Sequence, residues 1–192
     1  MGTIVNQPPG VPWYGFVRIT AHLEDPGFCM LLKRSGCAML KIGLESGDQQ
    51  VLDSLHKGVD LEQASRALRN LKRAGIGTYV YLLFGTPEEG LAEARKTLDF
   101  VVRQHDQIDF VNLALFNLPI EQQEAAPLET NHFYEGDLSL YTDFVHPKGW
   151  HRRKARQFLD KEFKRHRAVA SILRKTPPTF TSNHAPFFVR TR

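Results

Sequence analysis

The chain has 192 residues, a formal net charge of +4 and a hydrophobic content of 42%, enough for one globular core with an extension. No run of about 18 apolar residues occurs, so we expect no transmembrane helix. Residues 1–12 lack the basic head and apolar run of a secretory signal, and we expect a flexible lead-in. Only two cysteines are present, which argues against a disulfide-built secreted domain and favours a reduced, cytoplasmic setting.

Between residues 14 and 116 the pattern alternates strands and helices. The first helix is expected after Asp25, an N-cap residue followed by Pro26 at the first helical position, and to end at Gly36. Apolar runs predict four strands, at 15–20, 39–44, 78–84 and 108–116.

Two further helices are indicated between these strands. One begins at Asp60, where Gln63 is expected to complete a capping box, and ends at Gly75. The other has the start signal Thr86-Pro87-Glu88-Glu89, in which the two acids are interpreted as capping residues.

The repeated order of strand, helix and strand predicts an α/β fold with a parallel sheet and right-handed crossovers. Ligands of such sheets lie beyond the carboxyl ends of the strands. Residues 45–48, 85–89 and 116–121 follow three of these ends, so we expect them on one rim.

The regular alternation stops near residue 118, and residues 119–192 form a predicted C-terminal extension. A basic helix is expected over about 151–174, because residues 152–175 hold ten Lys or Arg and two acids. Binding of RNA or an acidic partner is one interpretation. A packed helix with a solvated basic face is favoured, because apolar residues recur along it at 155, 158, 159, 169, 170 and 173.

Two motifs carry a family resemblance. Lys41-Ile42-Gly43-Leu44-Glu45-Ser46-Gly47 precedes Tyr81-Leu82-Leu83-Phe84-Gly85-Thr86-Pro87-Glu88-Glu89, and a helix ending at Ala74-Gly75-Ile76 stands between them. In this order they resemble the second half of the radical S-adenosylmethionine (SAM) barrel, over residues 13–118. The likeness is to the cobalamin-dependent, methylthiotransferase-like and coproporphyrinogen-oxidase-like branches. The resemblance implies a partial, open TIM-like barrel with outer helices, a C-terminal helix and a tail.

The resemblance also implies a set of SAM-binding residues. Glu45 would bind the ribose or the amino-acid part of SAM, because a carboxylate accepts two hydrogen bonds from a diol or pairs with an ammonium. The remaining assignments are Ser46 as a neighbouring hydrogen-bonding group, Lys57 against the SAM carboxylate, and Leu83, Phe84 and Gly85 against adenine. Tyr81 departs from the branches that place an acid within this strand.

Each assignment has a plainer alternative. Glu45 could be an acid at a helix N-terminus, and Lys57 a solvated lysine. Arg18 is either an inward-facing group on the binding rim or an ordinary exposed strand residue. The eight histidines show no zinc spacing, and a metal site at His146 and His151 is disfavoured.

The family's CxxxCxxC motif is absent from this chain. Three thiolates hold the [4Fe–4S] cluster of radical SAM enzymes, and Cys29 and Cys37 cannot supply them. They are interpreted as small buried hydrophobes. The cluster is therefore expected only in a full-length parent, and the chain alone is expected not to cleave SAM.

Two functions from different classes follow. In the first, the chain is part of a radical SAM enzyme, supplying part of the SAM pocket and a substrate wall for chemistry through a 5′-deoxyadenosyl radical. In the second, it is a non-catalytic α/β binding or interaction module. A CxxxCxxC motif directly upstream in the gene would favour the first. The open edge at the strand with Arg18 is expected to be covered by a missing N-terminal barrel half, a second copy, the lead-in or the tail.

Overall fold

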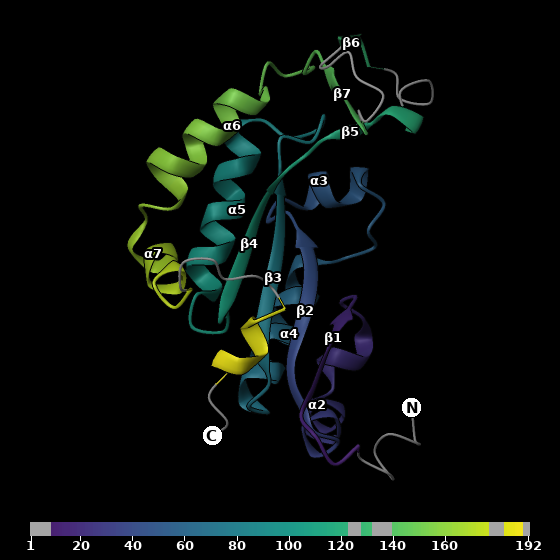
Figure 1. Cartoon of the computed structure of the whole chain (residues 1–192), viewed down its shortest axis with the longest axis vertical. Helices are drawn as coiled ribbons and strands as arrows, with labels where there is room; N and C mark the ends of the chain where they lie inside the picture. Colours follow the sequence, from purple (N-terminus) through teal and green to yellow (C-terminus); the bar gives the residue numbers. More distant parts are fainter. Residues whose placement is uncertain (1–8, 123–127, 132–139, 177–182, 190–192) are drawn as a thin grey trace.

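The computed structural model describes residues 9–122, 128–131, 140–176 and 183–189. Its centre is a parallel sheet in the order β1-β2-β3-β4 (Figure 1). The strands are β1 (Trp13–Val17), β2 (Cys37–Glu45), β3 (Gly77–Phe84) and β4 (Phe110–Leu115). The α/β prediction is confirmed, and the sheet is an open part of a barrel within the described residues.

Helices connect these strands and cover one face of the sheet. They are η1 (Ala21–Glu24), α2 (Pro26–Arg34), α3 (Gln49–Ser54), α4 (Leu61–Arg73) and α5 (Leu91–Gln104). Asp25 caps α2 by accepting from the Gly27 N–H at 2.8 Å, and Asp60 caps α4 by accepting from Gln63 N–H at 2.8 Å. The expected capping box is incomplete, because the Gln63 amide donates to Glu24 Oε1 at 2.6 Å instead.

The predicted start of the third helix at Thr86 is wrong. Residues 86–89 form a turn, and α5 begins at Leu91 with Gly90 as its N-cap. Glu93 performs the capping that was expected of Glu88 and Glu89, because its Oε2 accepts from the Gly90 N–H at 2.7 Å. The start signal therefore belongs to a turn before the helix.

The extension contains a small antiparallel sheet and a chain of helices. The sheet has the order β5-β7-β6, formed by β5 (Leu118–Pro119), β7 (Tyr141–Phe144) and β6 (Thr130–Asn131). The expected single basic helix is broken into α6 (Arg152–Phe158), the π-helical η3 (Leu159–Phe163) and α7 (Arg167–Leu173). The break occurs at 164–166, where His166 Nδ1 accepts from the Ala168 N–H at 3.3 Å and caps α7.

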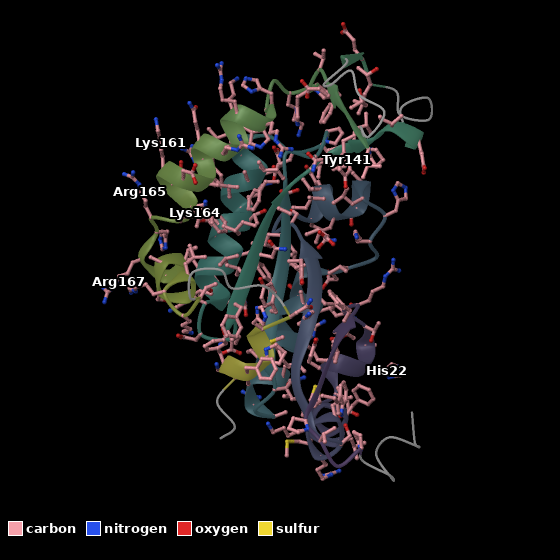
Figure 2. The ribbon with its side chains drawn as sticks, viewed as in Figure 1. His22, Tyr141, Lys161, Lys164, Arg165 and Arg167 are labelled. Carbon is pink, nitrogen blue, oxygen red and sulfur yellow. The ribbon has the colours of Figure 1, made fainter. Side chains whose placement is uncertain are left out.

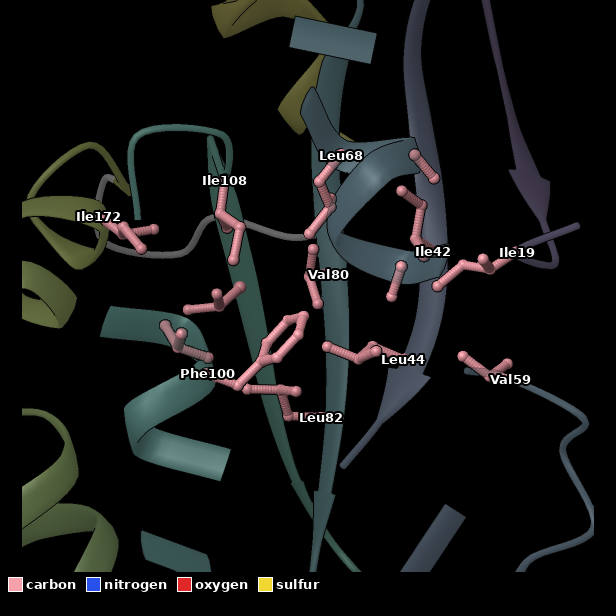
Figure 3. Packing of buried hydrophobic residues seen from close by; sticks show 14 of the residues in the cluster. Ile19, Ile42, Leu44, Val59, Leu68, Val80, Leu82, Phe100, Ile108 and Ile172 are labelled. Atoms are coloured by element: carbon pink, nitrogen blue, oxygen red, sulfur yellow. The ribbon is translucent and has the colours of Figure 1, made fainter. Parts of the chain in front are cut away.

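The main core lies between the sheet and its helices. Leu44, Val80 and Leu82 point from the strands toward Phe100 of α5 and Leu68 of α4 (Figure 3). These side chains are at most 2% exposed. We call this side of the sheet the helix face and the opposite side the inner face.

The C-terminal tail covers part of the inner face. Helix η4 (Ala185–Phe188) crosses in front of the sheet, and Ala185 packs on Met39, Tyr79 and Phe110 (Figure 1). Beside this cluster the Lys41 amine donates to Asn183 Oδ1 at 3.0 Å. The upper part of the inner face, toward the carboxyl ends of the strands, lies beyond this tail.

Strand β1 stands at the edge of the parallel sheet. Two of its inner-face side chains are open to solvent, since Tyr14 is 43% and Phe16 is 74% exposed. Both rings pack against the Lys41 amine, at 4.6 and 4.8 Å from the ring centroids. The predicted cover for this edge stays a prediction. In the described part of the chain no helix is long and apolar enough to cross a membrane.

Candidate functional site

Glu45 ends β2 in an unusual backbone conformation. Its φ is +68°, in the left-handed region that costs energy for a residue with a side chain. The pairing of β2 with β3 shifts between Gly43 and Glu45, as in a β-bulge, and Glu45 comes to lie beside Leu82. The bulge changes the direction of the Glu45 side chain at the carboxyl end of the sheet, and the carboxylate comes to lie beside Gly43.

The Glu45 carboxylate lies across Gly43. A Cβ atom built on Gly43 would meet Glu45 Oε1 at 3.0 Å, so the missing side chain makes room for this carboxylate. Alternation along β2 directs that Cβ to the inner face, together with Lys41. Lys57 Nζ donates to the same Oε1 at 3.1 Å, and the two side chains are 36% (Lys57) and 17% (Glu45) exposed. The two residues expected to contact SAM form a partly exposed ion pair at the rim.

Ser46 has a different position from the one expected of a SAM contact. It is 1% exposed, and its hydroxyl lies 3.2 Å from Thr97 Oγ1 of α5 and accepts from the Asp48 N–H at 3.1 Å. The Gly47 N–H donates to Thr97 Oγ1 at 2.9 Å. These hydrogen bonds hold residues 46 and 47 against α5 on the helix face of the sheet, so Ser46 stabilises the backbone position of Glu45.

The turn after β3 is held by a buried carboxylate. Gly85 adopts a φ of +81°, and its N–H donates to Glu89 Oε2 at 2.5 Å. The same oxygen accepts from Trp150 Nε1 at 3.0 Å. Burial raises the pKa of Glu89 to about 7, against the lowering effect of these two N–H donors.

A second contact from the extension holds the same turn. His146 Nε2 lies 2.8 Å from the Thr86 carbonyl oxygen, which requires the Nε2–H tautomer for a hydrogen bond. Its other nitrogen, Nδ1, accepts from the Lys148 N–H at 3.2 Å. Burial lowers the pKa of His146, which favours the neutral ring. Sequence reasoning missed the contact of His146 with Thr86 and that of Trp150 with Glu89, because each joins residues about 60 positions apart.

The three residues expected against adenine do not point the same way. Leu83 is half-buried on the inner face, two residues beyond Tyr81. Phe84 lies on the helix face with no exposed surface, in ring contact with Phe158 and Phe163. The Phe84 side chain therefore belongs to the core, and Leu83 with the Gly85 turn remains at the inner rim. Arg18 is exposed and follows the end of β1.

A cavity of about 370 Å³ opens beside the Gly85 turn. We call it the rim cavity. Its wall comes from the end of β3, the end of β4 and the residues that follow, β7, and the start of α6. The lining residues are Phe84, Gly85, Leu115, Phe116, Asn117, Leu118, Leu140, Tyr141, Thr142, Asp143, Phe144, His146, His151 and Arg152. The predicted neighbours 85 and 116–118 are thus brought together, and Glu45 and Lys57 lie outside this lining.

The two cysteines do not fit an iron–sulfur cluster. Cys29 and Cys37 are buried, and their thiols lie near the carbonyl oxygens of Leu23 and Met39 at 3.6 and 3.9 Å. Burial raises the pKa of Cys37 to about 12, which disfavours the thiolate that binds iron. Among the described residues no group of three or more His, Cys, Asp or Glu side chains could hold a metal ion.

The basic segment packs one side and exposes the other. Ala155, Phe158, Phe163, Val169 and Ile172 are buried in the main core. Figure 2 shows the opposite side, where four cations lie along the outer edge of the molecule: Lys161, Lys164, Arg165 and Arg167. The apolar face agrees with the packed helix favoured from the sequence, and RNA binding stays a prediction.

The segment that contains this rim is similar to a known protein family. The profile described as the Radical SAM superfamily matches residues 15–101, which include Glu45, Lys57 and the Gly85 turn. This match covers less than half of the chain and agrees with the family resemblance drawn from the sequence. This segment spans the sheet from β1 to β3 with the helices between and after these strands.

Two curated relatives each match about half of the chain. Bacteriochlorophyllide d C-12(1)-methyltransferase of Chlorobaculum tepidum is 29% identical over 102 residues, 53% of this chain and 22% of the relative. Anaerobic magnesium-protoporphyrin IX monomethyl ester cyclase of Rubrivivax gelatinosus is 30% identical over 86 residues, 45% of this chain and 16% of the relative. The chain thus spans less than a quarter of the length of either relative.

A solved structure shares the fold over nearly the whole chain. The radical SAM methyltransferase TsrM of Kitasatospora setae, with tryptophan and a SAM analogue bound, superposes with a TM-score of 0.59 at 19% identity. The match covers 93% of this chain and 40% of the other. The fold likeness therefore includes the extension as well as the radical SAM segment.

Proposed function

We propose that the chain forms part of the SAM pocket of a radical SAM enzyme whose whole protein carries out methyl transfer. The observation that carries the proposal is the Glu45 carboxylate, held on the inner face over Gly43 and beside Lys57. A carboxylate and an ammonium at one rim match the hydroxyl and ammonium donors and the carboxylate acceptor of SAM. Methyltransferases stand among the relatives and the solved structures, which supports the reaction class.

Within this pocket each group has a defined task. Glu45 accepts hydrogen bonds from the ribose hydroxyls or the ammonium of SAM, Lys57 pairs with its carboxylate, and Leu83 with the Gly85 turn lies against adenine. When bound, SAM supplies a methyl group or, with a reduced cluster, a 5′-deoxyadenosyl group for radical chemistry. The [4Fe–4S] cluster does not fit this chain, so a CxxxCxxC segment outside the given sequence has to supply it.

The closure of the barrel follows from the same proposal. The edge at β1, with Tyr14 and Phe16 exposed, is where an N-terminal barrel half would add its strands. A second copy of this chain is the other candidate for the same edge. Either partner would complete the substrate wall on the inner face.

Calorimetric titration with S-adenosylhomocysteine tests the proposal. We expect Glu45→Gln to weaken binding by roughly 10-fold, because a charge-assisted pair of hydrogen bonds is lost. Glu62→Gln serves as the matched control, since Glu62 is an exposed acid of α4 with a side chain 86% exposed. Equal affinities for the wild type and Glu45→Gln, or no binding by the wild type at millimolar ligand, would contradict the proposal.

A further inference from the structure

We propose that the rim cavity is a second binding site, which takes a flat aromatic molecule carrying a carboxylate. The proposal rests on the proposed function only in assigning SAM to the inner face. The cavity volume of about 370 Å³ is in the range of small-molecule sites, toward its lower end. This volume is sufficient for a fused aromatic ring system.

The cavity is walled by aromatic rings from two separate parts of the chain. Phe116 follows β4 and Phe144 ends β7, and their rings meet edge to face with centroids 5.7 Å apart. Along β7 the exposure alternates, so that Thr142 is buried and Phe144 half-buried while Tyr141 is exposed. Thr142 and Phe144 thus share the inward side of the strand. An aromatic ligand gains edge-to-face and stacking contacts from such a pair of rings.

The polar end of the cavity is cationic. Arg152 Nη1 donates to the Asn117 side-chain oxygen, which holds the guanidinium at the cavity. A guanidinium has five N–H donors in a planar fork, so one bond to Asn117 leaves the fork able to bind a carboxylate. His151 lines the cavity next to Arg152 and adds a second group able to donate. These groups distinguish a carboxylate ligand from a neutral one.

Asp143 is the only acid among the described lining residues. It is exposed and lies on the same side of β7 as Tyr141, opposite to Thr142 and Phe144. Its side chain is therefore on the other side of β7 from the Phe144 ring, although the residue contributes to the cavity lining. The inward surface combines apolar walls with the Arg152 fork.

The rim cavity and the proposed SAM pocket have different linings, because Glu45, Lys57 and Leu83 lie outside the lining of the cavity. The cavity lies at the ends of β3 and β4, where Gly85, Leu115 and Phe116 contribute to its lining. Glu45 lies over the inner face, and Leu83 points to the same side. The Gly85 turn is the element that both sites share, so a ligand in the cavity would lie close to SAM without occupying its pocket.

Calorimetric titration of the full chain with 2-naphthoate and with the neutral 2-naphthamide tests the proposal. We expect the acid to bind roughly 10-fold more tightly than the amide. Arg152→Gln should abolish this preference, and Arg152→Lys should restore part of it because the charge returns without the planar fork. Arg153→Gln is the matched control, since Arg153 is an exposed neighbour outside the cavity lining. Circular dichroism of each variant confirms the fold.

A competition experiment separates the two sites. Saturating S-adenosylhomocysteine should leave the affinity for 2-naphthoate unchanged, and Glu45→Gln should weaken only the binding of S-adenosylhomocysteine. Displacement of 2-naphthoate by S-adenosylhomocysteine would overturn the second site. So would equal binding of acid and amide, an unchanged preference in Arg152→Gln, or no binding of either probe. Failure of the SAM proposal alone would appear as absent S-adenosylhomocysteine binding with the naphthoate preference intact.

Discussion

The buried carboxyl group of Glu89 makes the stability of the folded chain depend on pH. Its carboxyl group has no exposed surface, and Oε1 has no hydrogen-bond partner among the described residues. Burial raises the pKa from the usual 4.5 to about 7, and Glu93 adds to the rise, while the N–H donors of Gly85 and Trp150 and the charge of Lys148 oppose it. The folded chain therefore holds a proton on Glu89 at pH values where the unfolded chain has released it.

The sign and size of the effect follow from linkage. Between pH 4.5 and about 7 the folded state binds more protons than the unfolded state, so the free energy of unfolding falls as pH rises. At 1.36 kcal/mol per pH unit, this interval corresponds to a loss of about 3 kcal/mol by pH 8. Glu89→Gln keeps an acceptor for Gly85 and Trp150 and removes the titration. His146 acts in the opposite direction, because its lowered pKa makes stability rise with pH. Both the wild type and Glu89→Gln contain His146, so the difference between their stability curves isolates the effect of Glu89.

Urea unfolding at pH 5, 6, 7 and 8 measures this difference. The wild type should lose about 2.5 kcal/mol relative to Glu89→Gln between pH 5 and 8. Glu88→Gln is the control, because Glu88 is the half-buried neighbour that takes no part in the Gly85 and Trp150 bonds. Parallel curves for the wild type and Glu89→Gln would refute the buried-carboxylate reasoning.

Two glycine substitutions test the frame around Glu45. Gly47→Ala should destabilise the chain by about 1–3 kcal/mol in urea unfolding, because the new Cβ would lie 2.6 Å from Thr97 Cα. Gly15→Ala is the control and should cost less, because its nearest contact is at 3.9 Å. Equal losses of stability in the two variants would be inconsistent with the close approach at Gly47. Gly43→Ala should lower S-adenosylhomocysteine affinity several-fold by displacing the Glu45 carboxylate, with little change in the unfolding midpoint; unchanged affinity would show that the carboxylate has room to move.

The sequence predicted the parts of the fold that depend on local patterns. Asp25 and Asp60 cap the helices they were expected to cap, because an N-cap bond joins residues two or three apart. The order of the four strands and the rim position of Glu45 follow in the same way from alternating apolar runs. Glu45 and Lys57 were each expected at the SAM pocket, and the structure brings them into contact.

Contacts between segments far apart in the chain could not be predicted from local sequence patterns. Thr86-Pro87-Glu88-Glu89 has the composition of a helix start, but Trp150 draws the Glu89 carboxyl group inward and the helix begins later. Ser46 belongs to a motif whose polar residues suggested ligand binding, but its hydroxyl is hydrogen-bonded to Thr97 of α5 instead. In both cases the deciding partner lies more than 50 residues away.

The tail contact at Lys41 affects how the chain reaches its final state. The bond from Lys41 to Asn183 joins residues 142 positions apart, so it closes only after the sheet between them has formed. Until then Met39, Tyr79 and Phe110 present an uncovered apolar surface beside an unpaired amine. The chain is therefore most prone to self-association before η4 packs on the sheet, and this short segment acts as an intramolecular protector of the β-sheet surface.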